Sequence, residues 1–470
     1  MVTTSRIEES EGSWLSYRTV WRWHFYAGLF CIPFVIWLST TGSIYLFKPQ
    51  IDAWIDRPYD QLQINGPRAT ASSQVEAAIK AVPGSSLHYY GLPKTEHSAT
   101  RVIVGRGTEE DRVYVQPQTL AILHVINEDQ RFTNLIFRLH GELLMGDIGS
   151  MIVELAASWA IVMVVTGLYL CWPRQAEKVA GVFYPRFWRG KRIFLRDLHA
   201  VTGVWVSVFA LFLLLTGLQW ATVWGGLFKE VRTVVTRRTF RPDWNTGRSN
   251  ELADRAALNQ NSMPGMDMPA ESVAGMASDF SSERAYDPLN RVVSVVTPLD
   301  LAYPALISPP KEMGGPWLAK SDNQNRLLRT HLTVDGQSGR ILSRQDFQQQ
   351  SWLDRMLALS VSIHEGQLFG LANQLIGLVT CLGLIVLCVS ALLLWWSRRP
   401  IGVLGARARP HKPRFSWVLA VLILAFSLYL PMLGASLVMV SITERFLLAN
   451  IPPIRDWLGL EVKHSRTAAL

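Results

Sequence analysis

Cysteine is scarce in this chain of 470 residues, which contains only four. None of them forms a CxxC or CxxCH motif, so covalent c-type haem attachment and an iron–sulfur site of ordinary spacing are excluded. All four lie in long apolar runs, and the two long segments between those runs contain none. We therefore interpret them as small apolar packing residues: Cys31, Cys171, Cys381 and Cys388.

Motifs for nucleotide binding and hydrolysis are missing too. The chain has no P-loop, no GxGxxG fingerprint and no nucleophile elbow, so neither a nicotinamide site nor a hydrolytic site is expected. Charged residues make up only 18% of the chain, whereas hydrophobic residues make up 49%. This composition is typical of a membrane protein.

Five apolar runs are each long enough to cross a membrane, whose hydrocarbon core of about 30 Å needs roughly 20 helical residues. They cover residues 23–47, 149–172, 198–224, 371–396 and 415–440. The first run is too long for a signal peptide and has no small-residue cleavage site, so we keep it in the mature protein. The sequence thus predicts five transmembrane helices in contact with membrane lipid.

Basic residues set the orientation of these helices. The linkers 174–197 and 398–414 are short and rich in Arg and Lys, and such linkers stay in the cytoplasm. The N-terminus then lies inside as well, while the long segments 48–134 and 225–357 and the C-terminal tail lie outside. The net charge of +9 is mainly a topology signal, and we expect no nucleic acid partner.

This topology divides the chain into ten segments. They are 1–47, the cytoplasmic N-terminus and first span; 48–134, the first outer module; 135–173, an outer histidine segment and second span; 174–197, a basic cytoplasmic loop; 198–224, the third span; 225–357, the second outer module with a Met-containing insert; 358–397, an outer histidine segment and fourth span; 398–414, a basic cytoplasmic loop; 415–440, the fifth span; and 441–470, an outer tail.

Four histidines occur as two matched pairs. His24 and His199 are each followed, at offsets of 4, 17 and 18, by Gly, Thr and Gly. His140 and His364 are each followed, at offsets of 6, 32 and 34, by Gly, Trp and Arg. The match indicates that one membrane-spanning unit occurs twice in the chain.

Histidines at fixed places on apolar spans indicate a buried metal centre, since ionisable residues there are costly and usually functional. His24 and His199 begin outward-running helices, and His140 and His364 precede inward-running ones. The sequence therefore predicts two b-type haems, an inner one held by the first pair and an outer one held by the second. With both axial positions filled, such iron suits electron transfer. The alternative is that all four are interfacial histidines.

The helix that follows each outer histidine is expected to be interrupted. A continuous helix from His140 to Trp172 would measure about 48 Å, which exceeds the hydrocarbon core. Gly146 and Gly370 are the expected breaks. Arg22, Arg138 and Arg196 lie near the four histidines and are candidate partners for haem propionates, although basic residues are ordinary at span ends.

Each long outer segment is expected to fold as a small α+β module. In the first, residues 73–79 read as a helix that ends at Pro83-Gly84. Strand patterns follow, around a turn at 116–119, in residues 86–90, 101–104, 112–115 and 120–125. The second segment ends in the same way, with strands at 329–334 and 340–342 around the turn 335–339.

A strand, a Gln/Asp-x-Gln-[ST] turn, a second strand and a histidine-headed membrane helix resemble the PepSY-associated transmembrane family, in particular its siderophore-iron reductase branch (FoxB-type). The resemblance covers residues 18–400. Its motifs are Trp23-His24-Phe25-Tyr26-Ala27-Gly28, Leu139-His140-Gly141-Glu142, Asp197-Leu198-His199-Ala200-Val201-Thr202-Gly203 and His364-Glu365-Gly366-Gln367-Leu368-Phe369-Gly370.

The resemblance implies a mainly α-helical membrane protein: a pseudo-two-fold bundle of two duplicated helix pairs plus a fifth transmembrane helix, with two periplasmic α+β PepSY-like modules. It further implies a bacterial inner-membrane oxidoreductase that passes electrons outward to a ferric siderophore and releases Fe(II). The chain has no donor site of its own, so the electrons must come from a flavoprotein, reduced flavin or quinol.

Two other functions remain open. The segment from Met263 to Met276 gathers thioethers, which favour Cu(I), so a Cu(II) reductase or copper-handling protein is the first. The same segment is equally typical of a flexible linker. The second is a non-redox protein whose PepSY domains bind peptides and whose histidines are structural.

Overall fold

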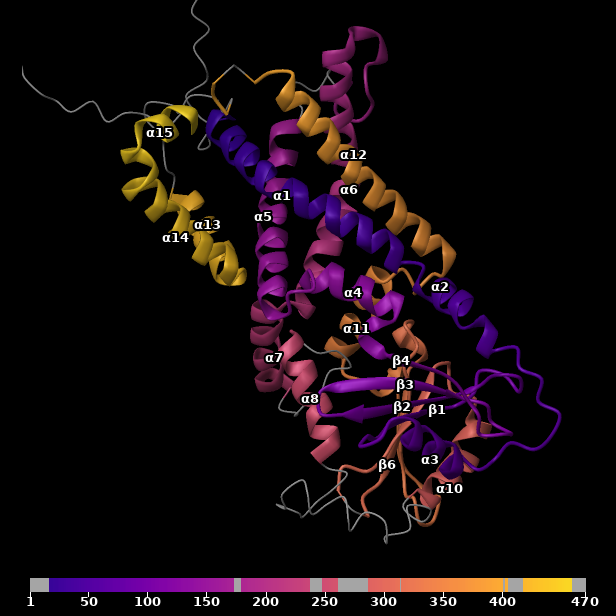
Figure 1. The fold of residues 1–470 in the computed structure, drawn as a ribbon. Helices are drawn as coiled ribbons and strands as arrows, with labels where there is room; N and C mark the ends of the chain where they lie inside the picture. Colours follow the sequence, from indigo (N-terminus) through magenta and orange to yellow (C-terminus); the bar gives the residue numbers. More distant parts are fainter. Residues whose placement is uncertain are drawn as a thin grey trace, which may run out of the picture. The chain divides into compact units, whose positions relative to one another are not determined.

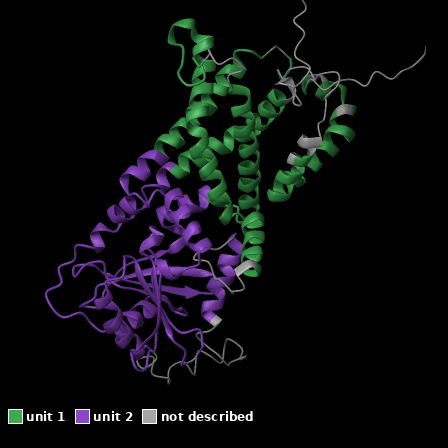
Figure 2. Ribbon diagram, turned by 180° about the vertical axis from the view of Figure 1, so that it is seen from behind, with its two compact units in different colours: residues 1–42, 141–242, 378–470 green, residues 43–140, 243–377 purple. Residues whose placement is uncertain are grey.

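The computed structural model describes residues 17–172, 179–236, 247–260, 286–312, 314–399, 402–404 and 417–458. The Met263–Met276 segment, the start of the first basic linker (174–178), most of the second (398–414) and the end of the C-terminal tail lie outside these residues. The chain divides into two compact units (Figure 2): a helical unit of residues 1–42, 141–242 and 378–470, and a sheet unit of residues 43–140 and 243–377.

Among the described residues, four helical segments are long and apolar enough to cross a membrane. They are Val20–Tyr45, Asp147–Cys171, Lys191–Trp220 and Leu371–Trp396, and they confirm the first four predicted spans. The helices concerned are α1 (Tyr17–Tyr45), α5 (Asp147–Cys171), α6 (Lys191–Gly217) with the short η4 (Leu218–Trp220), and α12 (Leu371–Trp396). The chain is thus a membrane protein by length and composition of its helices.

Small residues allow these helices to approach one another closely. Ala27 and Cys31 of α1 are buried against Ala160 and Met163 of α5. On α12, a Cβ added at Gly383 would lie only 2.6 Å from Cγ1 of Val206 on α6. Membrane helices pack through such contacts because lipid is as apolar as their own side chains.

The fifth predicted span is not one continuous helix. Residues 417–446 form α13 (Trp417–Tyr429) and α14 (Pro431–Phe446), which are separated at Leu430. Pro431 has no backbone N–H and its ring blocks a helix that continues from the preceding turn, so the single helix expected over 415–440 is divided here. Leu430 and Leu433 are buried with Ile161 of α5. The short α15 (Pro452–Leu458) follows.

Helix α7 (Thr222–Thr236) extends the helical unit beyond the predicted end of the third span, and side chains of α5 cap its start. The Glu154 carboxylate, 2% exposed, accepts hydrogen bonds from the backbone N–H of Val223 (3.0 Å) and of Trp224 (3.1 Å). Ser150 Oγ accepts another from the N–H of Thr222 (3.2 Å). The first N–H groups of a helix lack partners within it, and α5 supplies them here.

The sheet unit is built on one eight-stranded antiparallel sheet of order β4-β3-β2-β1-β5-β6-β7-β8. Figure 1 labels β1 to β4 and β6 of this sheet. Its strands are β1 (Ser86–Gly91), β2 (Thr100–Arg106), β3 (Glu109–Val115), β4 (Ile122–Asn127), β5 (Ala305–Ser308), β6 (Trp317–Ser321), β7 (Thr330–Val334) and β8 (Ile341–Asp346). All six strands expected from the sequence are present.

The two outer segments do not form separate modules. Each contributes four consecutive strands, and β1 of the first pairs with β5 of the second through Tyr90 with Ile307 and Gly91 with Leu306. The expected pair of independent α+β modules is therefore joined into a single sheet. Pairing at the centre removes two exposed strand edges that separate modules would have left open.

One helix from each outer segment covers the same face of this sheet. They are α3 (Ala71–Ala81), whose N-cap Thr70 accepts from the N–H of Ser73, and α10 (Asp287–Val296). Val75, Leu289 and Val292 are fully buried against the strands. This shared core explains why the two segments fold together.

The remaining helices of the sheet unit are α2 (Lys48–Ile55), α4 (Phe132–Glu142), α8 (Arg248–Gln260) and α11 (Trp352–His364). Short 3₁₀ turns complete the described chain: η1 (Arg57–Tyr59), η2 (Glu128–Gln130), η3 (Phe187–Arg189), η6 (Thr297–Leu299), η7 (Arg326–Leu328), η8 (Phe347–Gln349) and η9 (Leu448–Asn450). Helix α4 ends in His140-Gly141-Glu142, and α11 ends at His364.

Candidate functional site

His24 and His199 face each other within the helical unit. His24 lies near the start of α1 and His199 near the start of α6, and both rings are half-buried. Their ring centroids are 6.4 Å apart, and the two ring planes are inclined by 78°. The structure thus brings together the first histidine pair predicted from the sequence.

The Nδ1 atom of each ring is fixed by a backbone carbonyl of a neighbouring helix. His24 Nδ1 lies 3.0 Å from the carbonyl oxygen of Met163 on α5, and His199 Nδ1 lies 3.1 Å from that of Leu387 on α12. A carbonyl oxygen only accepts hydrogen bonds, so each Nδ1 carries the proton and donates. In the neutral imidazole the Nε2 atom then keeps a lone pair, as a metal ligand requires.

The separation of the rings fits one metal ion between them. For two rings whose Nε2 atoms both point at one metal ion, a metal–imidazole bond of about 2.0 Å and a distance of about 1.1 Å from ring centre to nitrogen, counted on both sides, give about 6.2 Å between centroids. Two imidazoles supply only two ligands, and a haem brings four nitrogens of its own. Groups of three or more His, Cys, Asp or Glu suitable for a metal ion do not occur among the described residues. The residues present fit a haem.

The glycine that follows each of these histidines at an offset of four has a packing role. A Cβ added at Gly28 would lie 3.8 Å from Sδ of Met163, and one added at Gly203 would lie 3.4 Å from Cδ1 of Leu387. Residues four apart share one face of a helix, so each glycine faces the residue whose carbonyl binds the preceding histidine. The repeated His-x₃-Gly spacing therefore reflects two equivalent helix contacts.

His140 and His364 occupy equivalent positions in the sheet unit. Both are half-buried and lie in the last turn of a short helix, α4 or α11. The helix breaks expected after them are confirmed, since Gly146 and Gly370 have positive φ values of 62° and 58° and α5 and α12 begin directly afterwards. Joint ligation of one haem by His140 and His364 stays a prediction.

The three arginines suggested for haem propionates have different surroundings. Arg22 is 7% exposed and its guanidinium lies 5.4 Å from the centre of the Tyr26 ring. Arg196 pairs with Asp197 (3.3 Å), and Arg138 is half-buried on α4. Their role toward a propionate stays a prediction.

Met163 and Leu387 were not anticipated, because their contribution is a main-chain carbonyl that no side chain marks. A signal was nevertheless present in the numbering. Met163 stands at the same offset from His140 as Leu387 does from His364. The duplication thus pairs these two residues with each other, but it does not single them out among the other positions of the spans.

Residues 21–398 match the PepSY-associated TM region family. The chain belongs to that family. The matched region includes all four histidines and the first four spans, whereas α13, α14 and α15 of this PepSY-associated protein lie beyond it. No curated protein matches the chain.

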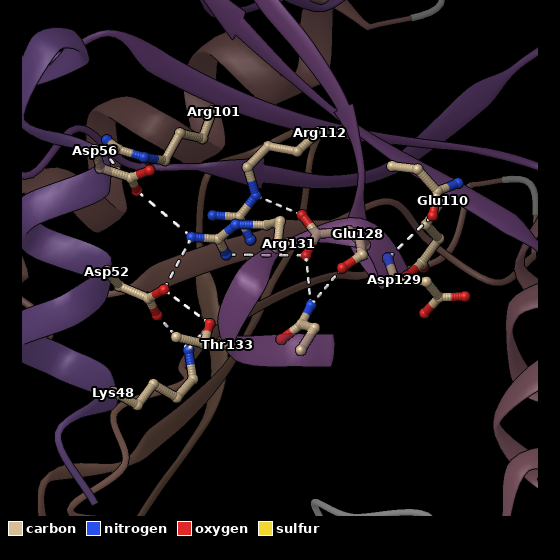
Figure 3. A network of polar contacts seen from close by, with 12 residues as sticks. Lys48, Asp52, Asp56, Arg101, Glu110, Arg112, Glu128, Asp129, Arg131 and Thr133 are labelled. Atoms are coloured by element: carbon tan, nitrogen blue, oxygen red, sulfur yellow. Dashed lines mark hydrogen bonds and ion pairs between the residues drawn. The ribbon is translucent and has the colours of Figure 1, made fainter. Parts of the chain in front are cut away.

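The PepSY-associated region also contains a buried ion-pair network that ties α4 to the sheet (Figure 3). Asp52 of α2 accepts from Thr133 Oγ1 at the start of α4 (2.8 Å) and pairs with Arg131 (3.4 Å). Glu128 binds Arg112 of β3; burial alone would raise the pKa of its carboxyl, but the charges of Arg112 and Arg131 lower it. This network fixes the start of the helix that carries His140.

Proposed function

We propose that this protein is a di-haem, bis-histidine reductase of the bacterial inner membrane that passes electrons outward to a periplasmic ferric siderophore. The observation that supports it most is the His24–His199 pair, with each Nδ1 donating to a carbonyl and each Nε2 left to bind iron. A resemblance to the siderophore-reductase branch of the PepSY-associated family implies a bis-histidine haem site of this kind.

In the proposed arrangement His24 and His199 hold the inner haem, and His140 and His364 hold the outer one. Bound haem supplies one-electron chemistry, since its iron alternates between the ferric and ferrous states. Each imidazole pair would bind the haem iron through Nε2, which would suit the site to electron transfer. The carbonyls of Met163 and Leu387 hold the two imidazoles of the first pair in a fixed orientation.

The direction of transfer follows from the basic linkers. Their positive charge favours a cytoplasmic location, so His24 and His199 lie near the inner surface and the sheet unit lies in the periplasm. A flavoprotein, reduced flavin or quinol donates the electrons. One electron converts the Fe(III) of a ferric siderophore to Fe(II), which hard oxygen donors bind less well. No acid–base residue is required.

Copper is the second candidate substrate, and the thioethers between Met263 and Met276 favour it. Deleting residues 263–276 discriminates between the two. If the segment is a linker, the variant keeps its reoxidation by a ferric siderophore. Selective loss of Cu(II)-driven reoxidation, with ferric siderophores inert toward the intact protein, would replace iron by copper.

Absorption spectroscopy of detergent-purified protein tests the proposal. A pyridine haemochrome assay should give about two b-type haems per chain. Dithionite-reduced protein should then be reoxidised by a ferric siderophore, with Fe(II) captured by a chelator. A colourless preparation from haem-replete cells would refute the redox function and leave the non-redox, peptide-binding alternative.

A further inference from the structure

Each Nδ1 of the His24–His199 pair meets a side-chain hydroxyl as well as a carbonyl. Thr166 Oγ1 lies 3.1 Å from His24 Nδ1, and Ser390 Oγ lies 3.4 Å from His199 Nδ1. Thr166 stands at the same offset from His140 as Ser390 does from His364. The hydroxyl pair is therefore duplicated along with the carbonyl pair, on α5 and on α12.

The hydrogens of both hydroxyls are already used on their own helices. Thr166 donates to the carbonyl of Val162 (2.8 Å) or Met163 (3.0 Å), and Ser390 donates to that of Leu387 (2.9 Å). Back-bonding of this kind is common for Ser and Thr in helices. It leaves oxygen lone pairs directed at the imidazoles. Each Nδ1–H is thus shared between a carbonyl oxygen and a hydroxyl oxygen.

We propose that Thr166 and Ser390 are positioning residues that set the electron donation of His24 and His199 and hence the redox potential of the inner haem. The inference rests on the proposed function. Two acceptors at Nδ1–H draw its proton away from the ring and increase the basicity of Nε2. A more basic axial nitrogen favours ferric over ferrous iron, so both hydroxyls lower the potential.

The two contacts are unequal. The Thr166 oxygen is closer to its imidazole than the Ser390 oxygen, at 3.1 Å against 3.4 Å. Hydrogen bonds weaken as the donor and acceptor move apart, so Thr166 has the larger effect. The β-branched side chain of Thr166 also has fewer rotamers than serine, which keeps its oxygen in place.

Paired substitutions distinguish the effect of the hydroxyl group on the potential from the effect of side-chain shape. Thr166→Val and Ser390→Ala remove the oxygen, whereas Thr166→Ser and Ser390→Thr keep it. Spectroelectrochemical titration should show the potential of the inner haem shifted upward in the first two variants, more in Thr166→Val. The conservative variants should keep a potential near the wild-type value, and the potential of the outer haem should not change in any of the four variants.

Two hydroxyls elsewhere on the helices of this chain serve as matched controls. Thr40 donates to the carbonyl of Ile36 (2.8 Å) and Ser441 to that of Leu437 (2.7 Å), and both side chains are exposed. Thr40→Val and Ser441→Ala remove the same kind of back-bond away from the imidazoles, so they should leave both potentials unchanged.

The outcomes distinguish this inference from the proposed function. An unchanged potential in Thr166→Val, or an equal shift in Thr40→Val, overturns the role of the hydroxyl while the two haems remain. If Thr166→Val loses the inner haem, retention by Thr166→Ser supports the role, and loss in both variants overturns it. Wild-type protein without haem overturns the proposed function and the inference together.

Discussion

The backbone of Gly167 lies directly against the imidazole of His24. A Cβ built at Gly167 would be 3.0 Å from Cε1 and 3.6 Å from Nδ1 of that ring. The duplication pairs Gly167 with Ala391, since each stands at the same offset from the outer histidine of its own half. The two matched stretches of sequence therefore differ in residue type at a position that contacts His24.

Gly167→Ala should displace the His24 ring, because a contact of 3.0 Å forces the neighbour to move by a few tenths of an ångström. We expect an altered electron paramagnetic resonance spectrum of the inner haem and a reduced haem content. Ala391→Gly, which opens space at the equivalent position, is the matched control and should leave the spectrum close to wild type. Identical spectra for wild type and Gly167→Ala would contradict the placement of His24 as a ligand.

Removing single histidines tests the pairing. His24→Ala and His199→Ala should each lose the same haem, because that haem is expected to need both imidazoles as ligands and each variant removes one of them. His140→Ala and His364→Ala should each lose the other haem. Redox titration of the four variants resolves the two components, and His97→Ala, at an exposed position, controls for substitution itself. Loss of a common component by His24→Ala and His140→Ala would show that the pairing is wrong.

Glu154→Leu should destabilise the helical unit. The substitution leaves the half-buried N–H groups of Val223 and Trp224 without acceptors. An unsatisfied donor costs about 1–3 kcal/mol when it is fully buried. Thermal unfolding in detergent should therefore start at a lower temperature. Glu154→Gln, which keeps one acceptor oxygen, should have a smaller effect, and Glu230→Gln at an exposed position of α7 should have almost none. Equal unfolding of all three variants would exclude the capping role.

The attachment of α8 to the sheet unit should be sensitive to acid. Arg248 and Arg255 of α8 pair with Asp129 of η2, and Arg255 also pairs with Glu110 of β3 (3.2 Å). Burial alone would raise the pKa of Asp129, but the hydrogen bond from Arg248 and the charge of Arg255 outweigh it and lower the pKa. Because folding lowers this pKa, the ionised carboxylate stabilises the folded state at pH values above its unfolded-state pKa of about 3.9. The stabilisation is lost as the pH falls through the folded-state pKa.

Hydrogen–deuterium exchange, corrected for the intrinsic rate at each pH, measures this effect in peptides covering residues 248–260. Protection of these peptides from exchange should be constant from pH 7 to about pH 5 and should decrease at pH values below about 4. Asp129→Asn should show weaker protection at neutral pH and a smaller decrease in acid. A decrease of the same size in Asp129→Asn as in wild type would assign the acid sensitivity to other groups.

Much of the fold could be predicted because its signals are local. The first four spans follow from the length of apolar runs, and the strands of the outer segments follow from alternating residues and turn chemistry. Helix length predicts a break after each outer histidine, and Gly146 and Gly370 give its position. The division at Leu430 had a local signal in Pro431, but the apolar run over 415–440 hides it if only hydropathy is considered.

The candidate site could be predicted only in the part that is formed by side chains at repeated spacings in the sequence. The duplicated spacing selected His24 and His199, and the structure places their rings 6.4 Å apart. Their acceptors on α5 and α12 are main-chain carbonyls, which every residue possesses, so residue identity cannot select Met163 or Leu387. Only the packing of the helices decides which carbonyl comes within reach.

The membrane class, the four main spans and the paired histidines could be predicted without a structure, because hydropathy and spacing are properties of residues close together in the chain. The tertiary structure decided that β1 pairs with β5, that α3 and α10 share one core, and that each Nδ1 meets a carbonyl. These contacts join residues more than a hundred positions apart. Their formation depends on how helices and strands pack as whole elements, which no local pattern encodes.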